Sequence, residues 1–195
     1  MPILNADLHC HSVVSDGTLT PEVLAERAAA NGVELWALTD HDEIGGQHRA
    51  LAAARSHGMH YLTGTEISVT FASATVHIVG LGFDPDNVEL TQGLRATRGG
   101  RGERAQEMSD QLAKVGITGA YEGALKFVGN PELVSRTHFA RFLVESGYCK
   151  ETSEVFRKYL TEGKPGFVPH SWATLQNAVR WLTGFNPTES KLSLL

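Results

Sequence analysis

Two observations on the sequence predict an α/β fold. Short apolar runs typical of strands alternate with segments of helical periodicity in the first part of the chain, and ionisable residues follow the ends of these runs. Strands that alternate with helices indicate parallel βαβ units. In such sheets functional sites form at the carboxyl ends of the strands. We therefore expect a site at that edge.

The elements of this first part can be placed in order. A short strand over residues 3–8 ends at His9. Thr20 is a suitable N-cap and Pro21 a suitable first residue for a helix that stops at Asn31-Gly32. The remaining predictions are a strand over 35–38, a helix over 46–57, and strands over 61–67 and 75–81.

From about Val88 onward the pattern is mostly helical. Glycines 99, 100 and 102 interrupt the first of these helices, and each lowers helix stability by about 1 kcal/mol relative to alanine, so we expect either a kink or a functional reason for them. Residues 184–190 are predicted to form a loop. Helices are predicted over 91–115, 133–146, 151–160 and, capped by Thr174, 174–182. We divide the chain into a barrel-type region, 1–87 and 171–195, and a helical substrate-recognition insertion, 88–170.

Composition excludes several classes of protein. The 195 residues include no apolar run of the roughly 20 residues that a membrane span needs. The N-terminus lacks the pattern of a secretory signal, and two cysteines make no disulfide framework, so a cytoplasmic location is the default expectation. A net charge of −5 disfavours broad non-specific binding of nucleic acid. No pattern indicates an obligate protein partner.

Each of four consecutive predicted strands ends in, or carries, a histidine or a carboxylate. His9 and His11 lie on one side of a strand end, because side chains alternate with a period of two. Alone, each residue of the set has an ordinary explanation as a core histidine, a turn aspartate or a solvated charge. Their convergence on one edge has no such ordinary explanation. A mixture of imidazoles and carboxylates suits Zn²⁺, Mn²⁺ or Fe²⁺. The predicted metal ligands are His9, His11, Asp16, His41, Glu66 and His77.

Five motifs resemble the opening motifs of the PHP (polymerase and histidinol phosphatase) family of metal-dependent phosphoesterases. They are Asp7-Leu8-His9-Cys10-His11-Ser12, Ser15-Asp16-Gly17, Thr39-Asp40-His41-Asp42, Gly64-Thr65-Glu66-Ile67-Ser68 and His77-Ile78-Val79-Gly80. Later segments, 119–125, 137–143 and 158–160, are similar to the bacterial branch that contains 3′,5′-nucleoside bisphosphate phosphatases and a 5′→3′ exoribonuclease. The resemblance extends to about Leu182 and implies an incomplete, distorted (β/α)₇ barrel with a mostly helical insertion.

The resemblance also implies roles for these residues. His9, His11 and Glu66 would hold one divalent metal, Glu66 and His77 a second, and Asp16 and His41 a third. Asp40 would fix the tautomer of a ligating histidine, as metal-bound histidines usually require. Mn²⁺ is the expected ion, with Zn²⁺, Fe²⁺ or Mg²⁺ as alternatives. A metal-activated water would hydrolyse a phosphate ester of a small nucleotide or of an RNA 5′ end.

Basic residues of the helical region are candidates for phosphate binding. Arg95, Arg98, Arg101 and Arg104 recur every three residues, which predicts one shared helix face. A solvated basic face explains Arg95 and Arg98 equally well. Guanidinium groups suit the geometry of phosphate, and helix starts favour anions. The predicted substrate-binding residues are Arg101, Arg104, Arg136 and His138.

The family's later Ala-His-Pro and Asp-Phe-His motifs are absent, since no aspartate follows Asp110 and no histidine follows His170. The expectation is a C-terminally truncated chain whose barrel lacks its closing strands, so a catalytically inactive remnant that still binds metal is the main alternative. A histidinol-phosphatase-like activity is a further one. Amidohydrolases also use an H-x-H motif, but they usually need a carbamylated lysine, and the first lysine here is Lys114.

Overall fold

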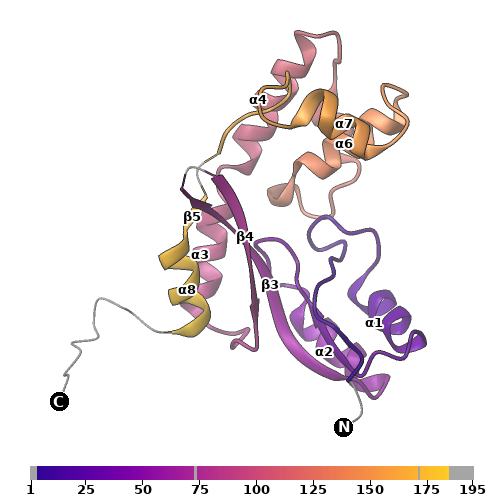
Figure 1. Ribbon diagram of the computed structural model, residues 1–195, viewed down its shortest axis with the longest axis vertical. Helices are drawn as coiled ribbons and strands as arrows, with labels where there is room; N and C mark the ends of the chain where they lie inside the picture. Colours follow the sequence, from indigo (N-terminus) through magenta and orange to yellow (C-terminus); the bar gives the residue numbers. More distant parts are fainter. Residues whose placement is uncertain (1–3, 73, 171, 185–195) are drawn as a thin grey trace, which may run out of the picture. The chain divides into compact units, whose positions relative to one another are not determined.

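A computed structural model describes residues 4–72, 74–170 and 172–184 of the chain (Figure 1). The chain divides into two compact units. Unit 1 contains the described parts of residues 1–10, 21–97 and 171–195, and unit 2 contains residues 11–20 and 98–170. Residue 3 of the first predicted strand and residues 185–190 of the predicted loop lie outside the described residues.

Unit 1 is built on a mixed β-sheet. β1 (Ala6–Asp7), β2 (Leu35–Leu38) and β3 (His60–Phe71) are parallel neighbours, and β4 (Ala74–Leu81) runs antiparallel to β3. β4 reverses direction because it follows β3 after a tight turn with no intervening helix. β5 (Ala173–Thr174) is parallel to the far end of β3. The α/β class is confirmed, and the described strands form an open sheet in the order β1-β2-β3-β4.

Two helices cover the first strands of this sheet. α1 (Pro21–Ala30) and α2 (Gln47–Ser56) pack small alanines against Trp36 and Leu38 of β2. Gln47 at the start of α2 fastens β2 to β3, because its amide nitrogen donates to the carbonyls of Leu38 (3.0 Å) and Gly64 (2.7 Å). The carboxyl end of β2 is thereby held to β3, and β1 pairs with the other edge of β2.

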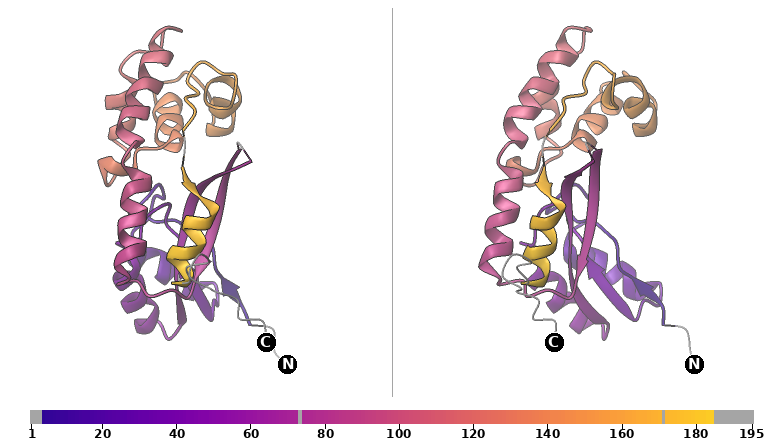
Figure 2. Two further views of the ribbon diagram at one scale, coloured as in Figure 1. Left: turned by 90° about the vertical axis from the view of Figure 1, so that its left-hand side faces the viewer. Right: turned by 60° about the vertical axis from the view of Figure 1, so that its left-hand side comes forward.

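A second pair of helices covers the other half of the sheet. Figure 2 shows α3 (Val88–Arg98) beside α8 (Leu175–Thr183), with α8 lying along β3 and β4. Their buried side chains pack on Ile67 and Val69 of β3. Cross-strand partners in an antiparallel pair share a face of the sheet, and alternate residues face opposite ways. Glu66 and Ser68 therefore lie on the face opposite these helices.

Unit 2 is helical. Its core is formed by buried residues of α4, α5 and α6, among them Met108, Leu112 and Phe139. Ser135 caps α6, and its side chain and backbone form a reciprocal capping box with His138. The elements are α4 (Arg101–Ala113), α5 (Ala120–Leu125), the 3₁₀ turn η1 (Pro131–Leu133), α6 (Arg136–Glu145), α7 (Thr152–Val155) and the π-helical turn η2 (Phe156–Leu160).

The structure refines several predicted elements. The predicted helix 91–115 is two helices, α3 and α4, which separate at Gly99-Gly100 where the sequence predicts a kink. The predicted single face bearing Arg95, Arg98, Arg101 and Arg104 is consequently wrong, because the break divides these residues between the two helices. α6 begins at Arg136 rather than at 133, since Ser135 provides the N-cap. α5 and β5 are not expected from the sequence.

The observed units differ from the predicted division at Val88. α3 groups with unit 1 up to Thr97, and the loop 11–20 groups with unit 2. The assignment of 88–170 to substrate recognition stays a proposal. None of the described helices is both long and apolar enough to cross a membrane.

Gly93 provides a test of the packing between α3 and α8. A Cβ atom at this position would overlap the indole ring of Trp181. We expect Gly93→Ala to lower the free energy of unfolding by about 1–3 kcal/mol, the usual effect of overpacking, although alanine is the better helix former. Urea unfolding followed by circular dichroism measures this change.

Gly102→Ala is the matched control, because no heavy atom lies within 4 Å of a Cβ placed there. This variant should be neutral or more stable by up to about 1 kcal/mol. A Gly93→Ala protein as stable as the parent would contradict the close approach of the two helices.

Candidate metal centre

The end of β1 is held against the end of β2 by Thr39. The backbone N–H of Thr39 donates to the Cys10 carbonyl (2.9 Å), and the backbone N–H of Cys10 donates to the Thr39 hydroxyl oxygen (3.1 Å). Burial raises the pKa of the Cys10 thiol to about 12, and that thiol donates to the Ala37 carbonyl (3.4 Å). Cys10 is therefore a protonated packing residue, and its fixed backbone places the adjacent His9.

The chain beyond β2 continues the parallel ladder with β3 for one more step. Glu66 N–H donates to the Asp40 carbonyl (3.1 Å), and Asp42 N–H donates to the Glu66 carbonyl (2.9 Å). These two bonds form an isolated parallel bridge between His41 and Glu66. His41 is thus set opposite Glu66 by the backbone itself.

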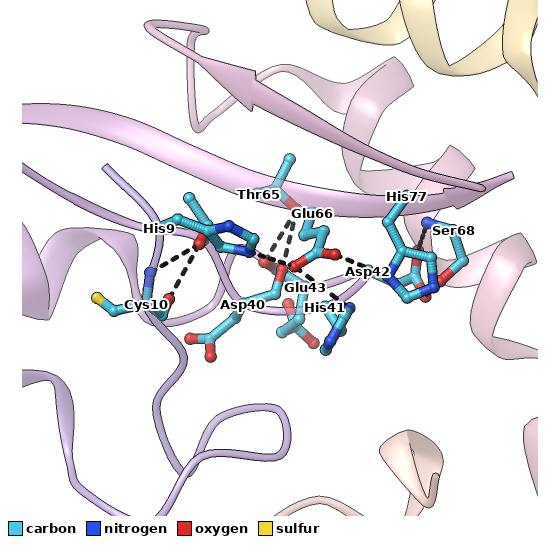
Figure 3. A network of polar contacts seen from close by, with 11 residues as sticks. His9, Cys10, Asp40, His41, Asp42, Glu43, Thr65, Glu66, Ser68 and His77 are labelled. Atoms are coloured by element: carbon cyan, nitrogen blue, oxygen red, sulfur yellow. Dashed lines mark hydrogen bonds and ion pairs between the residues drawn. The ribbon is translucent and has the colours of Figure 1, made fainter. Parts of the chain in front are cut away.

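The Glu66 carboxylate is the centre of a cluster of imidazoles (Figure 3). His9 Nε2 lies 2.7 Å from Glu66 Oε2, and His77 Nδ1 lies 2.7 Å from Glu66 Oε1. His41 Nδ1 lies 3.8 Å from Oε2, and its ring meets that of His77 edge-on with centroids 4.9 Å apart. Glu66 is buried, whereas the three histidines are partly exposed.

These groups fit a divalent metal. Ligand atoms of His41, Glu66 and His77 all lie within 4.8 Å of one another. Two ligand atoms bound at about 2.1 Å to one ion can be no more than about 4.2 Å apart, so movements of about half an ångström bring the set into contact with a common ion. Neutral imidazoles combined with a carboxylate are typical ligands of Zn²⁺, Mn²⁺ and Fe²⁺. The cluster supports a divalent metal centre without identifying the ion.

Four of the six predicted ligands, His9, His41, Glu66 and His77, come together in unit 1. His11 and Asp16 belong to unit 2, where their ligand atoms lie within 4.8 Å of each other. Chain geometry keeps the Cα atoms of residues two apart, such as His9 and His11, within about 7 Å. A common centre for all six stays a prediction.

Asp40, predicted to fix a histidine tautomer, is buried directly beside the ligands. Its carbonyl accepts hydrogen bonds from the Glu66 N–H (3.1 Å) and from the Thr65 hydroxyl (3.2 Å). These contacts hold the end of β2 to β3. The predicted role of the Asp40 carboxylate stays a prediction.

Three of the predicted phosphate-binding arginines form a cationic group in unit 2. Arg104 Nε donates to the Val168 carbonyl (2.9 Å), and Arg136 Nη1 donates to the Leu160 carbonyl (3.4 Å). Burial, followed by the nearby charges of Arg136 and Arg101, lowers the pKa of Arg104 to about 10. Burial also lowers the pKa of Arg136. Guanidinium groups that oppose one another's charge in this way favour an anion between them.

His138 performs a structural task at the start of α6. Its side chain is fully buried, and its Nδ1 accepts the backbone N–H of Ser135 (3.0 Å). The proton of the neutral ring therefore resides on Nε2. Burial lowers the pKa of His138 to about 4, so the ring is uncharged near neutral pH. Its predicted contact with substrate stays a prediction.

Two residues with evident positioning contacts are not singled out by the sequence. Arg141 donates from its guanidinium to the carbonyls of Asp16 and Gly17, which holds the loop of a predicted ligand to α6. Asp42 accepts hydrogen bonds from Ser68 close to Glu66. The clustering of Asp42 with two predicted site residues in Thr39-Asp40-His41-Asp42 could have indicated the second, whereas no local pattern marks Arg141.

Substitution of Glu66 tests the metal centre directly. In Glu66→Gln one ligand oxygen is replaced by an NH₂ group, which has no lone pair for a metal and no negative charge. We expect the affinity for Mn²⁺, measured by isothermal titration calorimetry, to fall by more than about 100-fold, beyond the usual effect of losing an outer-shell partner. Glu34→Gln makes the same change at an exposed carboxylate of unit 1 and should leave the affinity unchanged. Equal affinities in the two variants would reject Glu66 as a ligand.

Comparison with curated proteins finds relatives that match most of this chain. It is 53% identical to a 3′,5′-nucleoside bisphosphate phosphatase of Chromobacterium violaceum, with coverage of 92% of this chain and 63% of the relative. It is 40% identical to the 5′-3′ exoribonuclease Rnm of Escherichia coli, with coverage of 89% of this chain and 59% of the relative. The chain thus spans about three fifths of the length of these relatives.

Solved structures show the same fold. A structure from Chromobacterium violaceum, described as an amidohydrolase with bound sulfate and no metal, superposes with a TM-score of 0.91 at 53% identity, covering 92% of this chain and 63% of that one. One from Bifidobacterium adolescentis, proposed to be a metal-dependent phosphoesterase, gives 0.86 at 30% identity, covering 94% and 64%. The PHP domain matches residues 7–160, a range that contains every residue of the cluster around Glu66, and the chain therefore belongs to the PHP domain family.

Proposed function

We propose that this chain carries a metal-dependent phosphoesterase activity toward nucleotides, with 3′,5′-nucleoside bisphosphates or RNA 5′ ends as substrates. The observation that carries the proposal is the buried Glu66 carboxylate with an imidazole nitrogen 2.7 Å from each oxygen. A third imidazole, that of His41, is fixed opposite it by the backbone. The names of the two curated relatives supply the class of substrate.

In the proposed centre the predicted ligands would be shared among three ions. His9, His11 and Glu66 would hold one divalent ion, Glu66 and His77 a second, and Asp16 and His41 a third, with Mn²⁺ as the expected ion. When bound, such ions lower the pKa of water and neutralise charge on phosphoryl oxygens. Glu66 would serve both ions, and the position of a different histidine beside each of its oxygens supports this role. The backbone bridge between His41 and Glu66 holds the backbones of these two residues opposite each other.

The arginines of unit 2 would recognise the phosphates. Arg136 combines a half-buried guanidinium with a position over the Phe156 ring, 5.8 Å from its centroid, and this packing restricts its conformations before substrate arrives. Arg104 is similarly restricted by its bond to the Val168 carbonyl. Preorganised guanidinium groups lose less conformational entropy on binding. With a 3′,5′-nucleoside bisphosphate, hydrolysis would add water across one P–O bond, releasing inorganic phosphate and leaving a hydroxyl on a nucleoside monophosphate; at an RNA 5′ end, water would add across a phosphodiester bond and release the terminal nucleotide.

The expectation of a cytoplasmic protein, and the expected preference for Mn²⁺, stay predictions of the sequence. The choice between a mononucleotide and an RNA end depends on how many phosphates the arginines contact. A centre of this kind with a group of three arginines suits either a small bisphosphate or the terminus of a chain, because both present few phosphates at once.

The activity is tested by phosphate release from adenosine 3′,5′-bisphosphate in the presence of Mn²⁺. We expect release by the purified 195-residue chain and none above background by His9→Ala, because that change removes a nitrogen 2.7 Å from Glu66. A folded chain that binds Mn²⁺ without releasing phosphate would instead support a metal-binding protein without this activity.

Substrate recognition is tested separately by Arg136→Met. The change keeps an unbranched side chain but removes the charge, and hydrogen bonds to charged groups contribute about 1.5–3 kcal/mol. We expect KM for adenosine 3′,5′-bisphosphate to rise at least about tenfold. Arg157→Met alters an exposed arginine of the same unit and should leave KM unchanged. A rise of equal size in both variants would indicate a general electrostatic effect rather than a binding group.

A further inference from the structure

Asp42 has an unusual backbone conformation beside the candidate centre. Its φ is 49°, in the left-handed region that residues other than glycine seldom adopt, although Asp and Asn enter it more readily than most. The residue is also fully buried. A buried carboxylate in a disfavoured conformation is retained only where the surrounding structure fixes it.

The contacts of Asp42 explain this conformation. The bridge between His41 and Glu66 uses the Asp40 carbonyl and the Asp42 N–H. In a regular parallel ladder the next bond would join Ser68 N–H to the carbonyl of Asp42. Here Ser68 N–H donates instead to Asp42 Oδ1 (2.7 Å). The side chain replaces the backbone carbonyl, so the chain can turn away from β3 while the buried N–H of Ser68 keeps its partner.

A second hydrogen bond makes this replacement rigid. The Ser68 hydroxyl donates to Asp42 Oδ2 at 2.8 Å, so both carboxylate oxygens accept hydrogen bonds from the same residue (Figure 3). Asp42 is adjacent to His41, and Ser68 is the cross-strand partner of His77. Ser68 also lies on the same face of β3 as Glu66. The pair therefore links the backbone segments that carry three of the candidate ligands.

We propose that Asp42 is a positioning residue of the metal centre, which fixes the spacing of His41, Glu66 and His77 through Ser68. The inference rests on the proposed function, because it assumes that these three residues bind metal. Asp42 is assigned a positioning role because both of its oxygens accept hydrogen bonds from Ser68, and because it belongs to none of the described groups whose ligand atoms lie within 4.8 Å of one another. Its contribution is to the geometry that the free protein offers to the ion.

Two substitutions separate the carboxylate from the backbone conformation. Asparagine tolerates a positive φ and keeps an oxygen that can accept the Ser68 N–H, while its NH₂ group can donate to the Ser68 hydroxyl oxygen. Glycine adopts the same φ without strain but removes both acceptors. Comparison of Asp42→Asn with Asp42→Gly therefore isolates the two hydrogen bonds from any effect of φ.

The measurement is Mn²⁺ affinity by isothermal titration calorimetry, with the fraction of folded protein determined by circular dichroism in the same buffer. We expect Asp42→Asn to stay within about threefold of the parent and Asp42→Gly to bind about 10–100-fold more weakly per folded molecule, as for other residues that orient ligands. The Mn²⁺ affinity of Ser68→Ala, which keeps the backbone donor to Asp42, should lie between the affinities of these two variants.

A purely structural role for Asp42 would lower the unfolding midpoint of Asp42→Gly and leave the Mn²⁺ affinity of the folded fraction unchanged, which would overturn the inference. A folded Asp42→Asn protein that binds Mn²⁺ as weakly as His41→Ala would overturn it too, and this second result does not require the glycine variant to fold. A parent chain that binds no Mn²⁺ would instead refute the metal centre on which the proposed function depends.

Discussion

The burial of the Glu66 carboxylate is the constraint on which unit 1 depends. An ionised carboxylate inside a protein is strongly unfavourable unless charged or hydrogen-bonding partners surround it. Here the partners are His9 and His77, one on each oxygen. They arrive from the end of β1 and from the antiparallel β4. The sheet must therefore bring the end of β1 and the antiparallel β4 to a side chain of β3, and its mixed parallel and antiparallel pairing does so.

Along one edge, strand β3 pairs with several partners in turn. β2 pairs with residues 60–63, the His41 bridge follows at Glu66, the Asp42 carboxylate occupies the place opposite Ser68, and β5 pairs with Val69 and Thr70. An unpaired buried N–H would be destabilising. These partners follow one another along the edge of β3. The chain can therefore turn away from the sheet beside the site while the buried Ser68 N–H of β3 keeps a hydrogen-bond acceptor.

The sequence predicts the parts of this arrangement that depend on local patterns. β2, α1, α2 and the break at Gly99-Gly100 follow from apolar runs, caps and glycines, and the structure places them within one or two residues of the prediction. Of the four predicted ligands that converge, His9 and His41 follow the carboxyl ends of the neighbouring parallel strands β1 and β2, whereas Glu66 lies within β3 and His77 within the antiparallel β4. The two-residue β5 and the contacts of Arg141 depend on residues about 100 or more positions away, and no local pattern encodes such pairings.

The distribution of charge bears on the kind of substrate. The chain carries a net charge of −5, which repels a long polyanion, yet burial, followed by the nearby charges of Arg136 and Arg101, lowers the pKa of Arg104 in unit 2. Affinity for nucleic acid rises with the number of phosphates neutralised, and each contact adds to its dependence on salt. A local group of three cations in an acidic protein can neutralise only a few phosphates. For the function proposed above, that balance favours a nucleotide or a chain end over the interior of a long strand as the substrate.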